Sequence, residues 1–275
     1  MKKTKVLFLM QEITPYVDET YLSNVGRYLP QKIQENGFEI RTFTPKYGCI
    51  NERRNQLHEV IRLSGMNLII NEMDHPLIIK VASISSARMQ IYFIDNEDFF
   101  QRKAILCDAK GKFFNDNDER MIFFTRGAIE TVKKLSWAPD IIHCHGWITA
   151  FSPAYLKEVV KDNPLFANTK IVYSIYDGFD KDLDKNFKKK VLAEGIDSKT
   201  AKTIEKPSFE NLTKLAIDNS DAVILGKEGV DKEIINYLKS KDKLFIHHNE
   251  ETYVEEYSAL YEEVLNEVLN EVCVD

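Results

Sequence analysis

The chain has 275 residues, 44% of them hydrophobic, which is long enough to bury a large core as one α/β domain or two smaller ones. Its 37 Lys and Arg residues against 43 Asp and Glu residues give a net charge of −6, which argues against nucleic acid or an acidic membrane as the main partner. No apolar run approaches the about 20 residues that a membrane-spanning helix needs.

The N-terminus and the cysteines indicate a cytoplasmic protein. Basic residues open the chain, but residues 6–10 are the whole apolar run that follows, shorter than the roughly 7–15 residues of a signal-peptide core. The four cysteines are scattered at positions 49, 107, 144 and 273, without Cys-x-x-Cys spacing. We therefore expect reduced thiols and no bound metal.

The first 45 residues predict a β-α-β unit. Residues 5–10 form a short apolar strand, and residues 11–20 a polar turn. The helix that follows carries Leu22, Val25, Leu29 and Ile33 at the spacing of one face, and Gly37 is placed to end it. Residues 38–43 then form a second strand, and such units have parallel strands and a right-handed connection.

The next hundred residues change period. Short β-like runs at 66–70, 77–82 and 89–94 are separated by polar turns, which indicates a partly antiparallel insertion beside the main sheet. Residues 108–119 are polar and loop-like, and residues 122–135 predict a helix.

The central stretch predicts a buried strand ending near His143, a turn at Gly146 and a helix over residues 147–157. Ligands of open α/β sheets lie at the carboxyl ends of strands, where His143, His145 and Trp147 fall. We expect the two imidazoles to face opposite sides, so that one is packed inside the domain and the other is available to a ligand. A His-Cys-His zinc site is disfavoured because neighbouring residues on one strand cannot all reach one tetrahedral metal.

Strands and helices keep alternating to the end of the chain. Further strands are predicted at 170–176, 222–225 and 244–247, with helices ending at 217 and 239. The charged segment 177–206 predicts a solvated helix with loops, and its run Lys188-Lys189-Lys190 a solvated face. This alternation predicts an α/β fold with a doubly wound, mostly parallel, Rossmann-like sheet over residues 1–248.

Residues 249–275 predict an amphipathic C-terminal helix. Its apolar stripe holds Tyr253, Tyr257, Leu260, Tyr261, Val264, Leu265, Val268, Leu269 and Val272. The three tyrosines suit docking, either on the chain's own domain or on another subunit.

Four motifs in order resemble the N-terminal half of the glycogen and starch synthases. The first two are Lys5-Val-Leu-Phe followed by Glu12-Ile-Thr-Pro, and Leu29-Pro followed by Pro45-Lys-Tyr. The others are Asp116-Asn-Asp-Glu-Arg, against the family's Asp-Asn-x-Glu-Arg, and Asp140-Ile-Ile-His-Cys-His-Gly-Trp, against its Asp-x-x-His-x-His-Asp-Trp. The resemblance covers most of residues 1–245.

That resemblance implies the first half of a two-domain glycosyltransferase that transfers glucose from ADP-glucose or UDP-glucose to an α-glucan, with no separate cofactor. His145 is then the candidate catalytic residue. The candidate sugar- or nucleotide-binding residues are Glu12, Asp116, Asn117, His143, Trp147 and Tyr176. Two structural alternatives stand beside these roles: Glu12 as a backbone cap, and the Asp-Asn-Asp run as a turn.

The sequence also departs from the family. The family's Lys-x-Gly-Gly-Leu, where the lysine meets the pyrophosphate, is Asp18-Glu19-Thr20-Tyr21-Leu22 here, and two carboxylates near a phosphate repel it. The family's aspartate in the histidine motif is Gly146, and the histidine of its Ile-His-Asn is Tyr176. One hypothesis is a transferase domain that needs a partner protein to supply the second domain. The other is a non-catalytic module that binds carbohydrate or protein.

Overall fold

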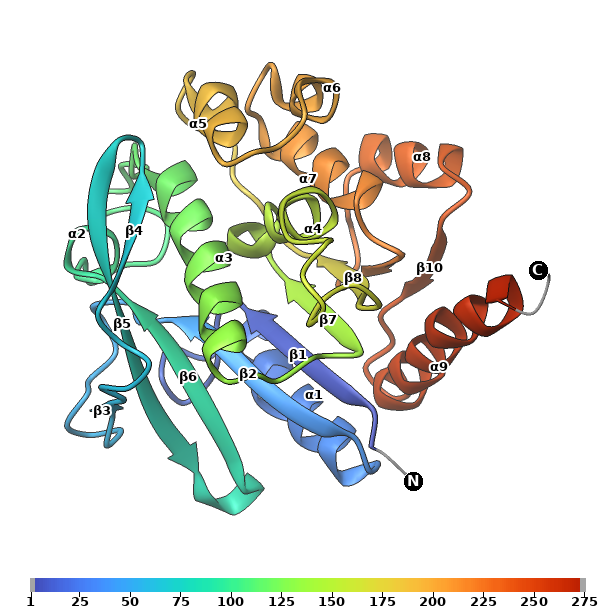
Figure 1. Ribbon diagram of the computed structural model, residues 1–275, viewed down its shortest axis with the longest axis horizontal. Coiled ribbons are helices and arrows are strands. Elements are labelled where there is room, and N and C mark those ends of the chain that lie inside the picture. The colour runs from blue at the N-terminus through green and yellow to red at the C-terminus, as the bar shows by residue number, and fades with distance from the viewer. Residues whose placement is uncertain (1–2, 273–275) are drawn as a thin grey trace.

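The computed structural model describes the backbone of residues 3–272 and the side chains of residues 3–266. Figure 1 shows a twisted sheet with helices on both faces. The strands are β1 (Lys5–Met10), β2 (Glu39–Pro45), β3 (His58–Glu59), β4 (Met66–Ile70), β5 (Met73–Ile84), β6 (Met89–Asp95), β7 (Ile141–His145), β8 (Lys170–Ile175), β9 (Ala222–Leu225) and β10 (Leu244–His247). The α-helices are α1 (Tyr21–Glu35), α2 (Glu97–Phe100), α3 (Asn117–Lys134), α4 (Ser152–Ala154), α5 (Phe187–Ala193), α6 (Ser198–Ala201), α7 (Phe209–Asp218), α8 (Lys232–Ser240) and α9 (Tyr253–Val272).

The sheet order confirms the predicted doubly wound, mostly parallel architecture. The strands run β10-β9-β8-β7-β1-β2-β6-β5-β3, with β4 paired to β5. Pairing is parallel from β10 across to β6, and antiparallel where β3, β4 and β6 meet β5. The predicted insertion is therefore present, and its last strand, β6, joins the parallel sheet beside β2.

The first β-α-β unit forms for the local reasons that its sequence indicates. Thr20 caps α1 in a capping box with Ser23, and the predicted apolar face is buried. The chain leaves the helix through Gly37, whose φ of 98° lies in the left-handed region that favours glycine. In Figure 1, α1 lies behind the sheet and α3 in front of it.

Two predicted helix boundaries are wrong. The helix α3 begins at Asn117, because Asp118 and Glu119 occupy its first turn, where carboxylates favour the positive end of the helix dipole. The helix predicted over residues 147–157 is broken into a 3-10 turn (η2, Trp147–Thr149), the short α4 and a π-turn (η3, Tyr155–Val159). Pro153 has no N–H to continue the hydrogen-bond ladder from η2.

The C-terminal helix α9 packs on its own domain, which decides between the two predicted docking modes. Its side chains Val254, Tyr257, Leu260, Tyr261 and Val264 are buried, and it lies against α1. The side chains of Val268, Leu269 and Val272, and Cys273, lie outside the described parts of the chain.

Cys49, Cys107 and Cys144 are free thiols. Within residues 3–272, none of the helices has the length and apolar character needed to cross a membrane.

Candidate functional site

The carboxyl ends of β1, β7 and β8 bring most of the predicted site residues together. In the parallel register Met10 lies beside His145, and His145 beside Ser174. The backbone continues this alignment past the strands, since the Gln11 N–H donates to the His145 carbonyl and the Gly146 N–H to the Ser174 carbonyl. The loop holding Glu12, the pair His143 and His145, and Trp147 therefore share one edge of the sheet.

The two histidines do not face opposite sides, so that prediction is wrong. Side chains of a strand alternate with a period of two residues, and His143 and His145 therefore point to the same face. Their ring centroids are 3.7 Å apart, and both side chains are fully buried. The face that they share is the one covered by α9.

Hydrogen bonds hold the first imidazole on both sides. His143 Nδ1 lies 2.6 Å from the Tyr261 hydroxyl of α9, and its Nε2 lies 2.7 Å from the Ser174 hydroxyl. Burial, together with neighbouring His145, lowers the pKa of His143 well below its usual value. His143 is therefore a neutral residue locked between the sheet and the C-terminal helix.

The second imidazole is held on one side only. His145 Nδ1 lies 3.1 Å from the Tyr176 hydroxyl, while its Nε2 has no hydrogen-bond partner in the described part of the chain. Burial, with a smaller contribution from His248, lowers the pKa of His145 to about 3. At neutral pH His145 is uncharged, and its Nε2 is left to donate or accept a hydrogen bond, depending on the tautomer.

Glu12 braces a loop. Its carboxylate accepts hydrogen bonds from the Gln11 amide at 2.7 Å and from the Thr20 hydroxyl at 2.8 Å. The same Gln11 side chain accepts a hydrogen bond from the backbone N–H of Trp147 at 3.0 Å, and the Trp147 indole is buried against Phe179. Gln11, which the sequence reasoning missed, thus ties the Glu12 loop to the histidine turn; its place directly after β1 is the signal that could have identified it.

The N-terminus of α1 is acidic and internally capped. The Ser23 N–H donates to the Thr20 hydroxyl at 2.9 Å, and the Thr20 N–H donates to the Ser23 hydroxyl at 2.8 Å. Asp18 and Glu19 are exposed directly before this cap. A phosphate at this helix end would meet two carboxylates where helix N-termini usually offer free N–H groups.

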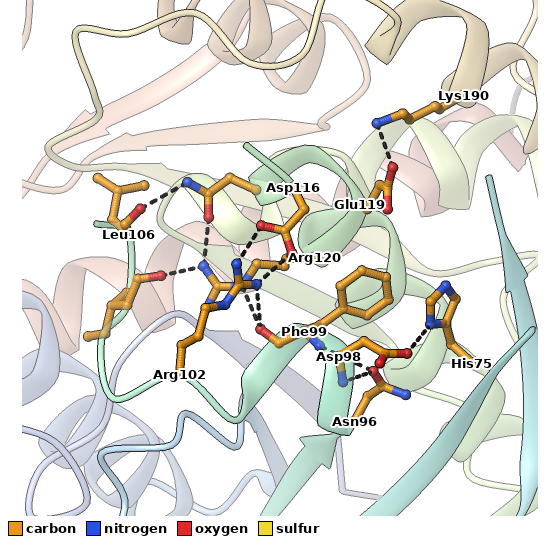
Figure 2. A network of polar contacts seen from close by, with 12 residues as sticks. His75, Asn96, Asp98, Phe99, Arg102, Leu106, Asp116, Glu119, Arg120 and Lys190 are labelled. Carbon is orange, nitrogen blue, oxygen red and sulfur yellow. Dashed lines mark hydrogen bonds and ion pairs between the residues drawn. The ribbon is translucent and has the colours of Figure 1, made fainter. Parts of the chain in front are cut away.

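Asp116 and Asn117 belong to a separate polar network, shown in Figure 2. The Arg102 guanidinium donates to both Asp116 oxygens, at 2.7 and 2.5 Å. Asn117 donates to the Leu106 carbonyl at 3.0 Å and accepts from Arg120 at 2.6 Å. These contacts fold the loop before α3 onto that helix, and no hydrogen bond or ion pair among residues 3–266 joins either side chain to the histidine pair.

Arg120 is the centre of that network. Its side chain is fully buried, and it donates to the carbonyls of Phe99 at 2.9 Å and Ile105 at 2.5 Å. Burial lowers its pKa to about 10, so the guanidinium remains charged at neutral pH. The Asp-Asn-Asp-Glu-Arg motif thus fixes loop structure through its last residue.

The Lys188-Lys189-Lys190 run is not wholly a solvated face, which corrects the prediction for its third residue. Lys190 is 8% exposed and lies 2.6 Å from Asp118 and 2.7 Å from Glu119. Burial raises the pKa of Asp118 to about 6, against the opposing effect of Lys190. The pair joins α5 to α3, a long-range contact that no local pattern indicates.

A hollow opens beside the site, at the carboxyl ends of β9 and β10. Its volume is about 750 Å³. It is lined by Tyr21, Lys227, Glu228, His247, His248, Asn249, Glu250 and Glu251. Within the described residues, no cluster of three or more His, Cys, Asp or Glu side chains is arranged to hold a metal ion.

Comparison with known proteins points to one family. The profile of the starch synthase catalytic domain matches residues 5–245. The glycogen synthase of Chlorobium luteolum is 39% identical over 176 residues, which are 64% of this chain and 36% of that protein. The glycogen synthase of Chlorobaculum parvum is 32% identical over 232 residues, which are 84% of this chain and 47% of that protein.

Among solved structures, the fold matches the catalytic domain of starch synthase IV from Arabidopsis thaliana, bound to ADP and acarbose. The TM-score is 0.70 at 20% identity, over 90% of this chain and 51% of that one. The present chain thus spans about half, or less, of the length of these relatives.

Proposed function

The chain belongs to the starch synthase catalytic domain family, and from this premise we propose that it forms one half of a site for glucosyl transfer to an α-glucan. The donor in this proposal is ADP-glucose or UDP-glucose, and a second domain supplies most of the nucleotide contacts. His145 is the catalytic residue, because its buried Nε2 is the ring nitrogen left to meet a sugar hydroxyl. Glu12, His143, Trp147 and Tyr176 position it, and the reaction takes place in the cytoplasm.

The observation that carries the proposal of an incomplete site is that the N-terminus of α1 is acidic and capped. Exposed Asp18 and Glu19 stand where the family's motif begins with a lysine, and Thr20 with Ser23 forms a capping box at the helix end. The domain therefore keeps the scaffold and the histidines but offers no positive charge to a diphosphate at this point. We propose that it does not transfer glucose unaided.

A transfer assay tests this proposal. The purified 275-residue chain is incubated with radiolabelled ADP-glucose or UDP-glucose and glycogen, with the glycogen synthase of Chlorobaculum parvum as the positive control. We expect no incorporation above a buffer blank from this chain alone. Labelled glycogen formed by the chain alone would overturn the proposal of an incomplete site.

A second candidate function is a non-catalytic module that binds carbohydrate or protein. It is favoured by the complete burial of His143 and His145 under α9. A pull-down separates the two functions. Recovery of a separate chain that restores glucosyl transfer would support the first proposal, in which this domain is half of a transferase site. Recovery of glucan, or of a protein without transferase activity, would support the non-catalytic binding module.

A further inference from the structure

A groove lined by tyrosines lies between α1 and the start of α9. Its walls include Tyr21, Asn24 and Tyr28 of α1, His248 and Glu250 of the loop after β10, and Tyr253 of α9. We call these six residues the tyrosine groove. Its volume is about 140 Å³, and it adjoins the 750 Å³ hollow at the sheet edge, with which it shares Tyr21, His248 and Glu250.

The rings in this groove are unusually accessible. Tyr21 is 39% exposed and Tyr28 is 49% exposed, whereas most large apolar side chains of the described residues are buried. They are seven positions apart on α1, so they lie on one side of the helix about 10 Å apart along its axis. No hydrogen bond within residues 3–266 uses either hydroxyl.

Neighbouring side chains hold the rings in place. Arg27 lies 5.2 Å from the centroid of the Tyr28 ring, and Lys32 lies 5.6 Å from that of Tyr253. The His248 ring stacks on Tyr253 at 4.8 Å, and its Nδ1 lies 2.8 Å from the Tyr257 hydroxyl. His248 Nε2 has no partner among the described residues, so the groove contains a fixed polar group as well as ordered aromatic faces.

The charges around the groove decide which class of ligand fits. Glu250 lines the groove, and Glu228 and Glu251 line the adjoining hollow, where Lys227 is already paired with Asp177. Arg27 and Lys32 lie against the Tyr28 and Tyr253 rings, but neither is among the residues that line the groove or the hollow. A phosphorylated ligand would be repelled by these carboxylates. A neutral polyhydroxyl ligand would instead place its C–H faces on the tyrosine rings and share its hydroxyl groups with Asn24, Glu250 and His248.

We propose that the tyrosine groove binds a neutral oligosaccharide chain, which continues into the adjoining hollow past Tyr21. This site is distinct from the histidine pair, and Tyr253 lies beyond the part of the chain that the family profile matches. The choice of an α-glucan as its ligand rests on the proposed function, whereas the inference that the groove binds a neutral oligosaccharide rests on its lining residues alone.

Calorimetric titration of the whole chain with maltoheptaose tests the proposal. Tyr28→Ala removes an exposed ring that packs in no core, and we expect it to weaken binding about tenfold. Tyr28→Phe keeps the ring and should bind within about twofold of the parent. Leu192→Ala is the matched control, because Leu192 on α5 is also 39% exposed and lies outside the groove.

The outcomes separate this proposal from the proposed function. Weakening by Tyr28→Ala but not by Leu192→Ala supports the groove, whatever the transfer assay gives. Absence of maltoheptaose binding, or equal affinity for Tyr28→Ala and the parent at unchanged melting temperature, would overturn it. Inorganic phosphate that competes with maltoheptaose would also overturn it, since the groove would then accept an anion.

Discussion

At the scale of single residues, the buried imidazole of His145 links stability to pH. Its pKa is about 3 in the folded chain, below the usual 6.5, so folding favours the neutral form. This stabilisation is complete above about pH 6.5 and is lost as the pH falls toward 3. We expect the free energy of unfolding to drop by about 2 kcal/mol between pH 7 and pH 5 on account of this residue.

The comparison that isolates this effect is denaturant unfolding of the parent and of His145→Gln at both pH values. Because Asp118 lies outside the histidine pair and titrates in both proteins, its contribution cancels in the difference. Between pH 7 and pH 5, the free energy of unfolding of the variant should fall by about 2 kcal/mol less than that of the parent. His58→Gln, at an exposed position, should behave like the parent, and an identical acid loss in all three would refute the assignment.

Gly146 is the second residue with a testable constraint. It has φ 84° and ψ 175°, and a Cβ at this position would lie 2.4 Å from Gln11 Oε1. Although the related motif carries aspartate here, Gly146→Asp should destabilise the chain by about 1–3 kcal/mol, because this backbone region is essentially restricted to glycine.

Gly111→Ala is the control for that prediction. Its φ is 76°, also in the left-handed region, but a Cβ would meet no atom within 4 Å. Thermal melts should rank Gly146→Asp below Gly111→Ala, because only the first adds a clash to the strain. A higher melting temperature for Gly146→Asp than for Gly111→Ala would show that the Gln11 side chain moves aside at little cost and that the turn at Gly146 tolerates a side chain.

At the scale of elements, the Lys190–Asp118 pair joins α5 to α3. Lys190→Ala would leave the fully buried Asp118 carboxylate without its nearest cation, and we expect a loss of about 3–5 kcal/mol at pH 7. Lys189→Ala, at the exposed neighbouring position, should change stability by less than about 0.5 kcal/mol. Denaturation midpoints measure both, and equal midpoints would mean that the run is solvated throughout.

The same pair shows where prediction from sequence ends. The strands β1, β9 and β10 and the buried face of α1 were predictable, because apolar run length and helical spacing are local properties. The burial of Lys190 was not, since the neighbouring lysines have the same local pattern and only the approach of α3 distinguishes them. Likewise Asp116 and Asn117 gave a motif, but their partners Arg102 and Arg120 were set by the tertiary fold.

The histidine turn was predicted in part. The strand and the glycine turn were correct, because Gly146 interrupts an apolar run. The orientation of the pair followed from strand period and was misjudged, although a residue spacing of two places both rings on one face. The α9 helix that bonds to His143 lies more than a hundred positions away in the chain, and its tyrosine stripe indicated docking without indicating the surface.

At the scale of the whole molecule, α9 closes the sheet face that carries the histidine pair. It lies beyond the matched family segment, yet Tyr257 and Tyr261 are fully buried and His143 depends on the Tyr261 hydroxyl. Helices α3, α4 and α7 cover the other face (Figure 1). The C-terminal helix is therefore part of the domain core, and weakening its polar contact should loosen the molecule as a whole.

Tyr261→Phe tests this claim by removing one oxygen atom. It leaves His143 Nδ1 buried without its partner, so we expect a loss of about 1–3 kcal/mol and faster amide exchange along α9. Tyr253→Phe on the same helix should change stability little, since no hydrogen bond within residues 3–266 uses the Tyr253 hydroxyl. If Tyr261→Phe matched Tyr253→Phe in both measurements, α9 would be held by apolar packing alone, and the histidine pair would be structurally independent of the C-terminal helix.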